Sequence, residues 1–166
     1  MKQLSAQMNL IAVFRPAILA AIAFLAYSSS SVAAPIEDEK WADSVGHYLE
    51  KMKAYDVDLL EIGKGATNGF DQRGMLALWD VANEYRIRLR HIQRLVAINQ
   101  LIQNDADRKH IRPIIDLEIT EVAKGIDGGV KEINIQLGNL RSPSLIATAD
   151  KLKDDLRALK NLLEQP

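Results

Sequence analysis

Residues 78–102 have the sequence LWDVANEYRIRLRHIQRLVAINQLI, and this stretch decides the fold class. Its apolar side chains recur at alternating steps of four and three residues: Leu78, Ala82, Tyr85, Leu89, Ile92 and Val96. Because an α-helix has about 3.6 residues per turn, that spacing places them on one face. Leu95, Ile98 and Ile102 broaden the apolar stripe. The stretch therefore predicts a long amphipathic helix that buries one side.

Three further segments show the same spacing, and no segment shows the alternation of a β-strand. The apolar positions are Trp41, Val45, Tyr48, Met52, Tyr55, Leu59 and Ile62 in the first segment; Ile115, Ile119, Val122, Ile126, Gly129, Ile133, Leu137 and Leu140 in the third; and Leu145, Ala149, Leu152, Leu156, Leu159 and Leu163 in the fourth. Four such segments with short connections predict an all-α fold, an antiparallel up-down four-helix bundle with coiled-coil-like packing.

Turn-forming residues mark the expected helix ends. A glycine-rich linker over Gly63–Gly74 follows the first segment, and Asp71 is the expected N-cap of the second. Asn104 is expected to close the second helix. Ser142 followed by Pro143 is typical of an N-cap with proline at the first helical position, and it begins the fourth helix.

The third segment has two features that disturb a helix. Pro113 lies either near its start or at a kink, because proline lacks the N–H that an inner turn needs. The glycines within Lys124–Gly129 leave two alternatives, one continuous helix or two helices joined by a turn. Continuity of the apolar stripe through Ile126 and Ile133 favours one helix.

Residues 1–33 are expected to be a signal peptide, and residues 34–166 the helical bundle domain. The apolar run Ala17–Tyr27 is too short to span a membrane but suits the core of a signal peptide. Ser31 and Ala33 are the small residues that a signal peptidase requires, so cleavage is expected between Ala33 and Ala34. An uncleaved anchor is the alternative, although Arg15 would then be buried in the membrane. The sequence thus predicts an exported protein, periplasmic or secreted, without a stable membrane anchor.

Composition excludes several chemistries. The chain has no Cys, so it forms no disulfide, thiolate metal site or cysteine nucleophile. Its 21 Lys and Arg against 22 Asp and Glu give a net charge of −1, which offers no general attraction for nucleic acid. No Glu-x-x-His motif accompanies the three histidines, and no nucleophile-elbow motif is present. We expect no metal, no cofactor and no catalytic residues, although an enzyme without recognisable motifs stays open.

The least expected feature is a basic segment in the second helix. From Tyr85 to Asn104 there is no acidic residue, but there are four arginines: Arg86, Arg88, Arg90 and Arg94. Helix phase places Arg86 and Arg88 beside the core, where acids of neighbouring helices are expected to pair with them. Arg90, His91 and Arg94 point outward, where guanidinium groups can receive carboxylates. All five basic residues are candidate partner-binding residues, and the expected partner is a protein with an acidic surface.

A second candidate site lies at the glycines of the third helix. Gly125 and Gly129 lie one turn apart beside the apolar seam, where either a neighbouring helix packs closely or a small ligand binds. Asn99 is a polar residue in an apolar stripe, so it either fixes the helix register or lines such a cavity.

These residues predict an exported, non-enzymatic bundle that binds another protein, as an inhibitor, an immunity-type factor or a component of an envelope assembly. The alternative is a small-molecule carrier or ligand-sensing bundle that binds an anionic or apolar ligand between its helices. A homodimer is compatible with the wide apolar stripe of the second helix.

Overall fold

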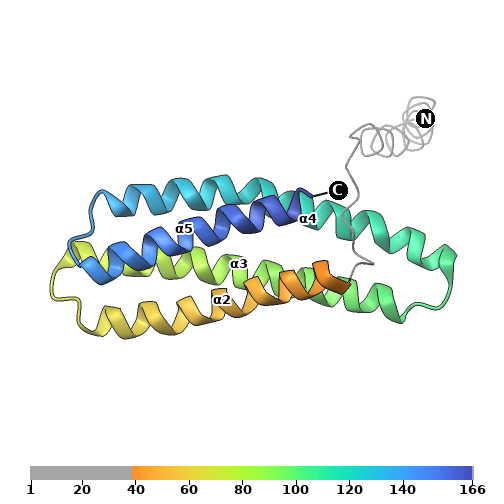
Figure 1. Cartoon of the computed structure of the whole chain (residues 1–166), viewed down its shortest axis with the longest axis horizontal. Coiled ribbons are helices and arrows are strands. Elements are labelled where there is room, and N and C mark those ends of the chain that lie inside the picture. The colour runs from red at the N-terminus through yellow and green to blue at the C-terminus, as the bar shows by residue number, and fades with distance from the viewer. Residues whose placement is uncertain (1–38, 166) are drawn as a thin grey trace, which may run out of the picture. The chain divides into compact units, whose positions relative to one another are not determined.

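The computed structural model describes residues 39–165, and all regular structure in this range is helical (Figure 1). The helices are α2 (Glu39–Lys64), α3 (Gly69–Leu101), α4 (Asp105–Leu137) and α5 (Pro143–Leu163). The predicted all-α class and four helices are confirmed. The expected signal peptide, residues 1–33, lies outside the described residues.

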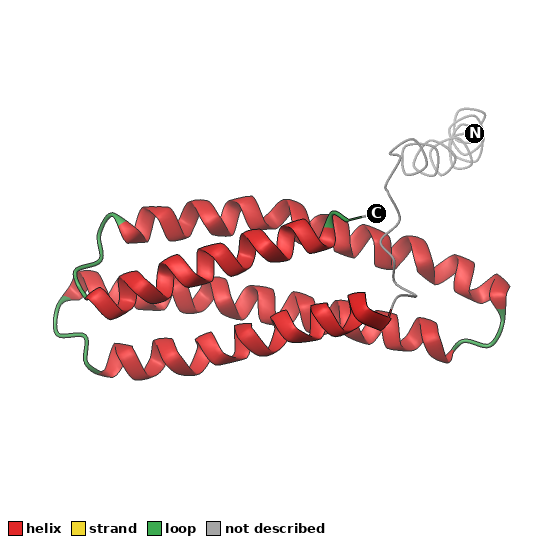
Figure 2. Cartoon of the chain, in the orientation of Figure 1, coloured by secondary structure: helices red, strands yellow, loops and turns green. Residues whose placement is uncertain are grey.

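Short loops join the helices, so consecutive helices run antiparallel (Figure 2). Each helix packs against the next one, and α2 also packs against α5, which closes the ring of four. A smaller diagonal contact joins α3 to α5. The arrangement is compatible with the predicted four-helix bundle. None of the described helices is long and apolar enough to cross a membrane.

Most of the core comes from the predicted stripes, although Tyr48, Ile62 and Leu137 are only half-buried, and the core also includes Leu49, Val81 and Ala123. From α3 it buries Leu78, Ala82, Tyr85, Leu89, Ile92 and Val96, which are the positions that the spacing selected. Leu145, Ala149, Leu152, Leu156, Leu159 and Leu163 do the same for α5. Ile98 is a correction, because the sequence placed it in the buried stripe and the structure leaves its side chain 48% exposed. Helix phase explains this, since Ile98 lies away from the direction of Leu89 and Ile92.

The start of α3 is a second correction. Asn68, not Asp71, is the N-cap, and its side chain accepts hydrogen bonds from the backbone N–H groups of Phe70 and Asp71. Asp71 is buried in the first turn, where its Oδ1 accepts from the backbone nitrogens of Arg141 at 2.8 Å and Ser142 at 3.1 Å. Asp71 therefore holds the α4–α5 loop against the beginning of α3.

Helix α4 is continuous from Asp105 to Leu137, as the stripe favoured, and Pro113 lies inside it. The glycines do not break it, and Gly129 lies against the ring of Tyr85. A Cβ atom built on Gly129 would lie 2.9 Å from Tyr85 Cε2, which is too close for an undistorted contact. Burial raises the pKa of Tyr85 to about 12, so its hydroxyl stays neutral inside the core.

A polar cluster joins α2 to α5. Asp155 Oδ1 lies 2.6 Å from Lys51 Nζ, and Asp155 Oδ2 accepts a 2.7 Å hydrogen bond from the Tyr55 hydroxyl. Burial and the adjacent carboxylate raise the pKa of Tyr55. The hydroxyl therefore acts as a donor that orients Asp155 and fixes the approach of the two helices.

The helices differ in length, and this creates a two-helix projection. Helices α3 and α4 have 33 residues each, whereas α2 has 26 and α5 has 21. At about 1.5 Å per residue, α3 is about 50 Å long and α5 about 32 Å. Figure 1 shows α3, α4 and their loop extending beyond the end of α5. We call residues 90–121 the α3–α4 tip.

The close contact between Gly129 and the Tyr85 ring gives the first prediction. Gly129→Ala would force the buried Tyr85 ring to move, whereas Gly128→Ala meets nothing within 4 Å. We expect Gly129→Ala to be less stable than Gly128→Ala by about 1–3 kcal/mol, because overpacking a core costs this much. Urea unfolding monitored by circular dichroism measures the difference. Equal stability of the two variants would show that the Tyr85 ring does not pack against Gly129.

The buried Asp71 gives a prediction about pH. The backbone N–H groups of Arg141 and Ser142 stabilise its carboxylate, so the pKa of Asp71 lies below its usual 3.8. A carboxyl with a lowered pKa stabilises the fold at neutral pH and loses this effect as pH falls through that pKa. Asp71→Asn should therefore lower the midpoint of thermal unfolding at pH 7, and lower it less near pH 2 to 3, about the range where Asp is protonated. An exposed control, Asp154→Asn, should leave the midpoint nearly unchanged at both pH values.

Candidate functional site

The outward face of α3 near its C-terminus is basic. Leu89, Ile92 and Val96 point into the core, so the residues between them are turned towards solvent. Arg90, His91 and Arg94 are indeed exposed. The helix thus holds three basic side chains on a rigid surface, within little more than one turn.

Two of the five predicted partner-binding residues are engaged within the chain. Arg86 Nε lies 2.8 Å from Asp56 Oδ2 on α2, and Arg86 also donates to Asn83. Arg88 Nη2 lies 2.8 Å from Glu84 Oε1, one turn earlier on its own helix. The expected cross-helix pairing holds for Arg86, whereas Arg88 pairs with an acid that lies just before the acid-free segment.

Arg90 and Arg94 differ from these two residues. Within residues 39–165, neither guanidinium group has an ion pair or a hydrogen bond. Both side chains are exposed, so their N–H donors are accessible to a partner. A carboxylate brought to this face can accept two parallel hydrogen bonds from one guanidinium group.

Exposed apolar side chains frame the basic residues. Ile87 is 57% exposed and Leu101 is 81% exposed, and Ile98 lies between them on the same side. These residues follow one line along the helix with steps of four, three, four and three: Ile87, His91, Arg94, Ile98 and Leu101. We call this line the outer seam of α3. It has the spacing of a coiled-coil seam but lies opposite the buried stripe.

Sequence analysis identified the basic part of this seam but missed its apolar part. The signal was present, because the second stripe can be counted out from Ile87 as readily as the first from Leu78. Assignment of Ile98 to the core concealed it. Two stripes on opposite faces indicate a helix with one packed face and one face suited to a partner.

A hollow of about 340 Å³ lies between the first turns of α2 and the last turns of α3, on the side of α3 that carries the buried Ile92 and Val96. Trp41 and Val45 line it from α2, and Gln93, Ala97 and Gln100 line it from α3. Its α3 wall comes from the same turns as Arg94. The hollow nevertheless faces α2, away from the outer seam.

The second candidate site is not assembled as one cavity around its three residues. The Tyr85 ring occupies the space over Gly129, and the Tyr85 hydroxyl lies 3.7 Å from the Cβ position of Gly125. Asn99 is buried 14 residues further along α3, about 21 Å away along the helix axis. Its Oδ1 has no hydrogen-bond partner among the described residues. A ligand at Gly129 would have to displace Tyr85, and ligand binding there stays a prediction.

Over residues 39–165, no group of three or more metal-ligating side chains comes together. The cluster of titratable groups between α2 and α5, Lys51, Tyr55 and Asp155, satisfies its own hydrogen bonds. Comparisons of the chain with protein-family models, with curated proteins and with solved structures found no match. The outer seam of α3 is therefore the candidate functional site, on the strength of its geometry and charge.

Proposed function

We propose that this protein is an exported, non-enzymatic helical bundle that binds a protein with an acidic surface through the outer seam of α3. One observation carries the proposal: Arg90 and Arg94 are exposed without an ion pair in the described chain, between the exposed side chains of Ile87 and Ile98. This role suits an inhibitor, an immunity-type factor or a component of an envelope assembly.

The combination of charge and apolar surface favours a protein partner over a free anion. An exposed ion pair contributes only about 0–1 kcal/mol, so two arginines alone would hold a partner weakly. Burial of an Ile or Leu side chain adds about 1.5–3 kcal/mol and removes water from the neighbouring charges. Nucleic acid fits less well, because the seam has no aromatic side chain for base stacking.

The proposal includes export and removal of residues 1–33. The apolar run Ala17–Tyr27 and the small residues Ser31 and Ala33 support it. All four described helices begin after the expected cleavage point, since α2 begins at Glu39. Cleavage between Ala33 and Ala34 would leave the described helices whole.

Export predicts a defined N-terminus. Expression of the full-length chain in a bacterium that carries general secretion machinery should yield protein that begins at Ala34 in the exported fraction. Intact-mass spectrometry and N-terminal sequencing measure this. Recovery of the uncleaved chain from the cytosol alone would contradict export.

Partner binding predicts a crosslink that depends on charge. A photo-crosslinking amino acid at Ile87 should capture a second polypeptide in the exported fraction of the native host. Arg90→Glu with Arg94→Glu should reduce capture at least about tenfold, because both guanidinium groups would become repulsive to an acidic surface. Gel mobility and mass spectrometry give the yield and the identity of the product.

A matched control separates binding from net charge. Lys131→Glu with Arg157→Glu changes the net charge by the same amount but alters α4 and α5 away from the seam. Capture should survive in this control. The proposal fails if charge reversal at Arg90 and Arg94 leaves capture intact, or if Ile87 captures nothing while a crosslinker at the distant Ile135 does.

A further inference from the structure

The α3–α4 tip carries a second exposed stripe, on α4. Ile114 is 56% exposed and Leu117 is 62% exposed, and both lie opposite the buried Ile115 and Ile119. With steps of four, three and four, the exposed line is His110, Ile114, Leu117 and Glu121. We call it the outer seam of α4.

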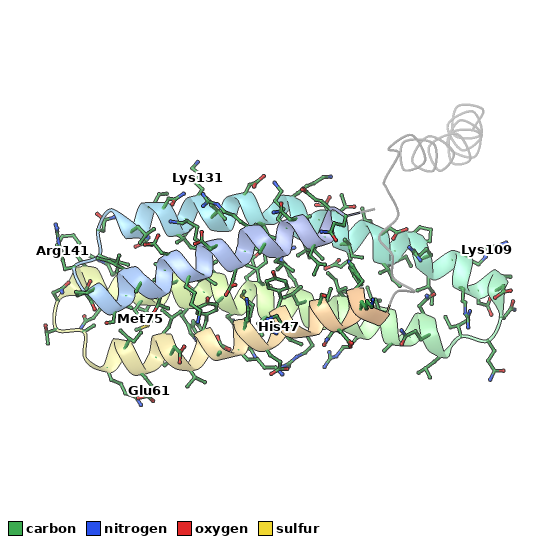
Figure 3. All side chains as sticks on the ribbon, in the orientation of Figure 1. His47, Glu61, Met75, Lys109, Lys131 and Arg141 are labelled. Carbon is green, nitrogen blue, oxygen red and sulfur yellow. The ribbon has the colours of Figure 1, made fainter. Side chains whose placement is uncertain are left out.

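The tip therefore presents two coiled-coil-like seams on adjacent antiparallel helices. Four of the ten exposed large apolar side chains of the described chain lie in it: Ile98, Leu101, Ile114 and Leu117. Lys109 marks this end of the molecule in Figure 3, where only α3 and α4 extend. Exposed apolar side chains that share one end of a molecule are candidates for an interaction surface.

The charged residues of the tip are unevenly divided between its two helices. The α3 part of the tip has Arg90 and Arg94 and no acid, whereas every acidic residue of the tip lies on α4. Over residues 90–121 there are five basic and five acidic side chains, so the tip is neutral as a whole. Glu118 has no ion pair in the described chain, and Glu121 has only an exposed pair with Lys124. Arg108, Lys109 and Arg112 lie on α4 beside its acids, but residues 116–121 contain three acidic residues and no basic one. This stretch of α4 is complementary to Arg90 and Arg94 of a second copy.

We propose that the partner of the outer seam of α3 is the outer seam of α4 in a second copy of this chain. A two-fold axis parallel to the helices would set each α3 against the other α4, antiparallel and at the same height as within one hairpin. Ile98 would then face Ile114 of the second copy, Arg94 would lie level with its Glu118, and Arg90 would lie level with its Glu121. Each contact occurs twice, and the two tips together form a four-helix unit.

This inference rests on the proposed function, because it names the partner of the same arginines. Its test is sedimentation velocity of the purified protein, obtained from expression of the full-length chain, over about 1–100 µM, where dimers of moderate affinity dissociate. The wild type should convert from monomer to dimer. Arg94→Glu and Glu118→Arg should each weaken the dimer at least about tenfold, because each places like charges opposite one another.

Charge exchange gives the decisive variant. Arg94→Glu combined with Glu118→Arg should recover most of the lost affinity, since the opposed charges are again unlike. Lys131→Glu should dimerise as the wild type does, and thermal melts check that every variant is folded. A monomer at all concentrations, or a combined variant no better than the single ones, overturns the inference. Capture of a different protein at Ile87 by a monomer would leave the proposed function standing and remove only the second copy as the partner.

Discussion

Burial of the α3 stripe is the constraint on which the rest of the structure depends. Helix α3 contacts all three other described helices, and its buried side chains fix its rotation about its own axis. Because Leu89, Ile92 and Val96 point inward, helix geometry turns Arg90 and Arg94 towards solvent. The same rotation aims Tyr85 at Gly129, so the packing of α3 on α4 and the composition of the outer seam have one cause.

Much of the fold follows from the sequence because helix periodicity is a local property. The spacing selected the buried positions of α3 and α5, and the Ser142 and Pro143 signal located the start of α5. Where prediction failed, the outcome depended on the partner helices or on competition between similar residues. Asn68 and Asp71 are both good N-caps, and only the position of the α4–α5 loop explains why Asp71 is used elsewhere. Exposure of Ile98 likewise depends on where the neighbouring helices lie.

The sequence predicted the charge of the candidate site but not which of its arginines form ion pairs within the chain. Outward placement of Arg90, His91 and Arg94 follows from helix phase alone. Engagement of Arg88 by Glu84 depends on side-chain rotamers that no spacing rule specifies. The extension of α3 and α4 past α5 could be predicted from the segment lengths. Only the structure shows that the exposed residues of both helices lie at the same end of the bundle.

Pro113 gives the tip a mechanical property of its own. Because proline has no amide hydrogen, the carbonyl of Lys109 lacks its helical partner, and the turns of α4 before Pro113 are joined to the remainder of the helix by one bond fewer. α5 ends short of these turns, so α3 is their main support. Amide hydrogens there should exchange with solvent by local opening, independently of global unfolding. A binding partner that covered the tip would thus couple the opening of these turns to the unfolding of the remaining bundle. The first measurable effect of association would be slower hydrogen exchange in residues 105–112.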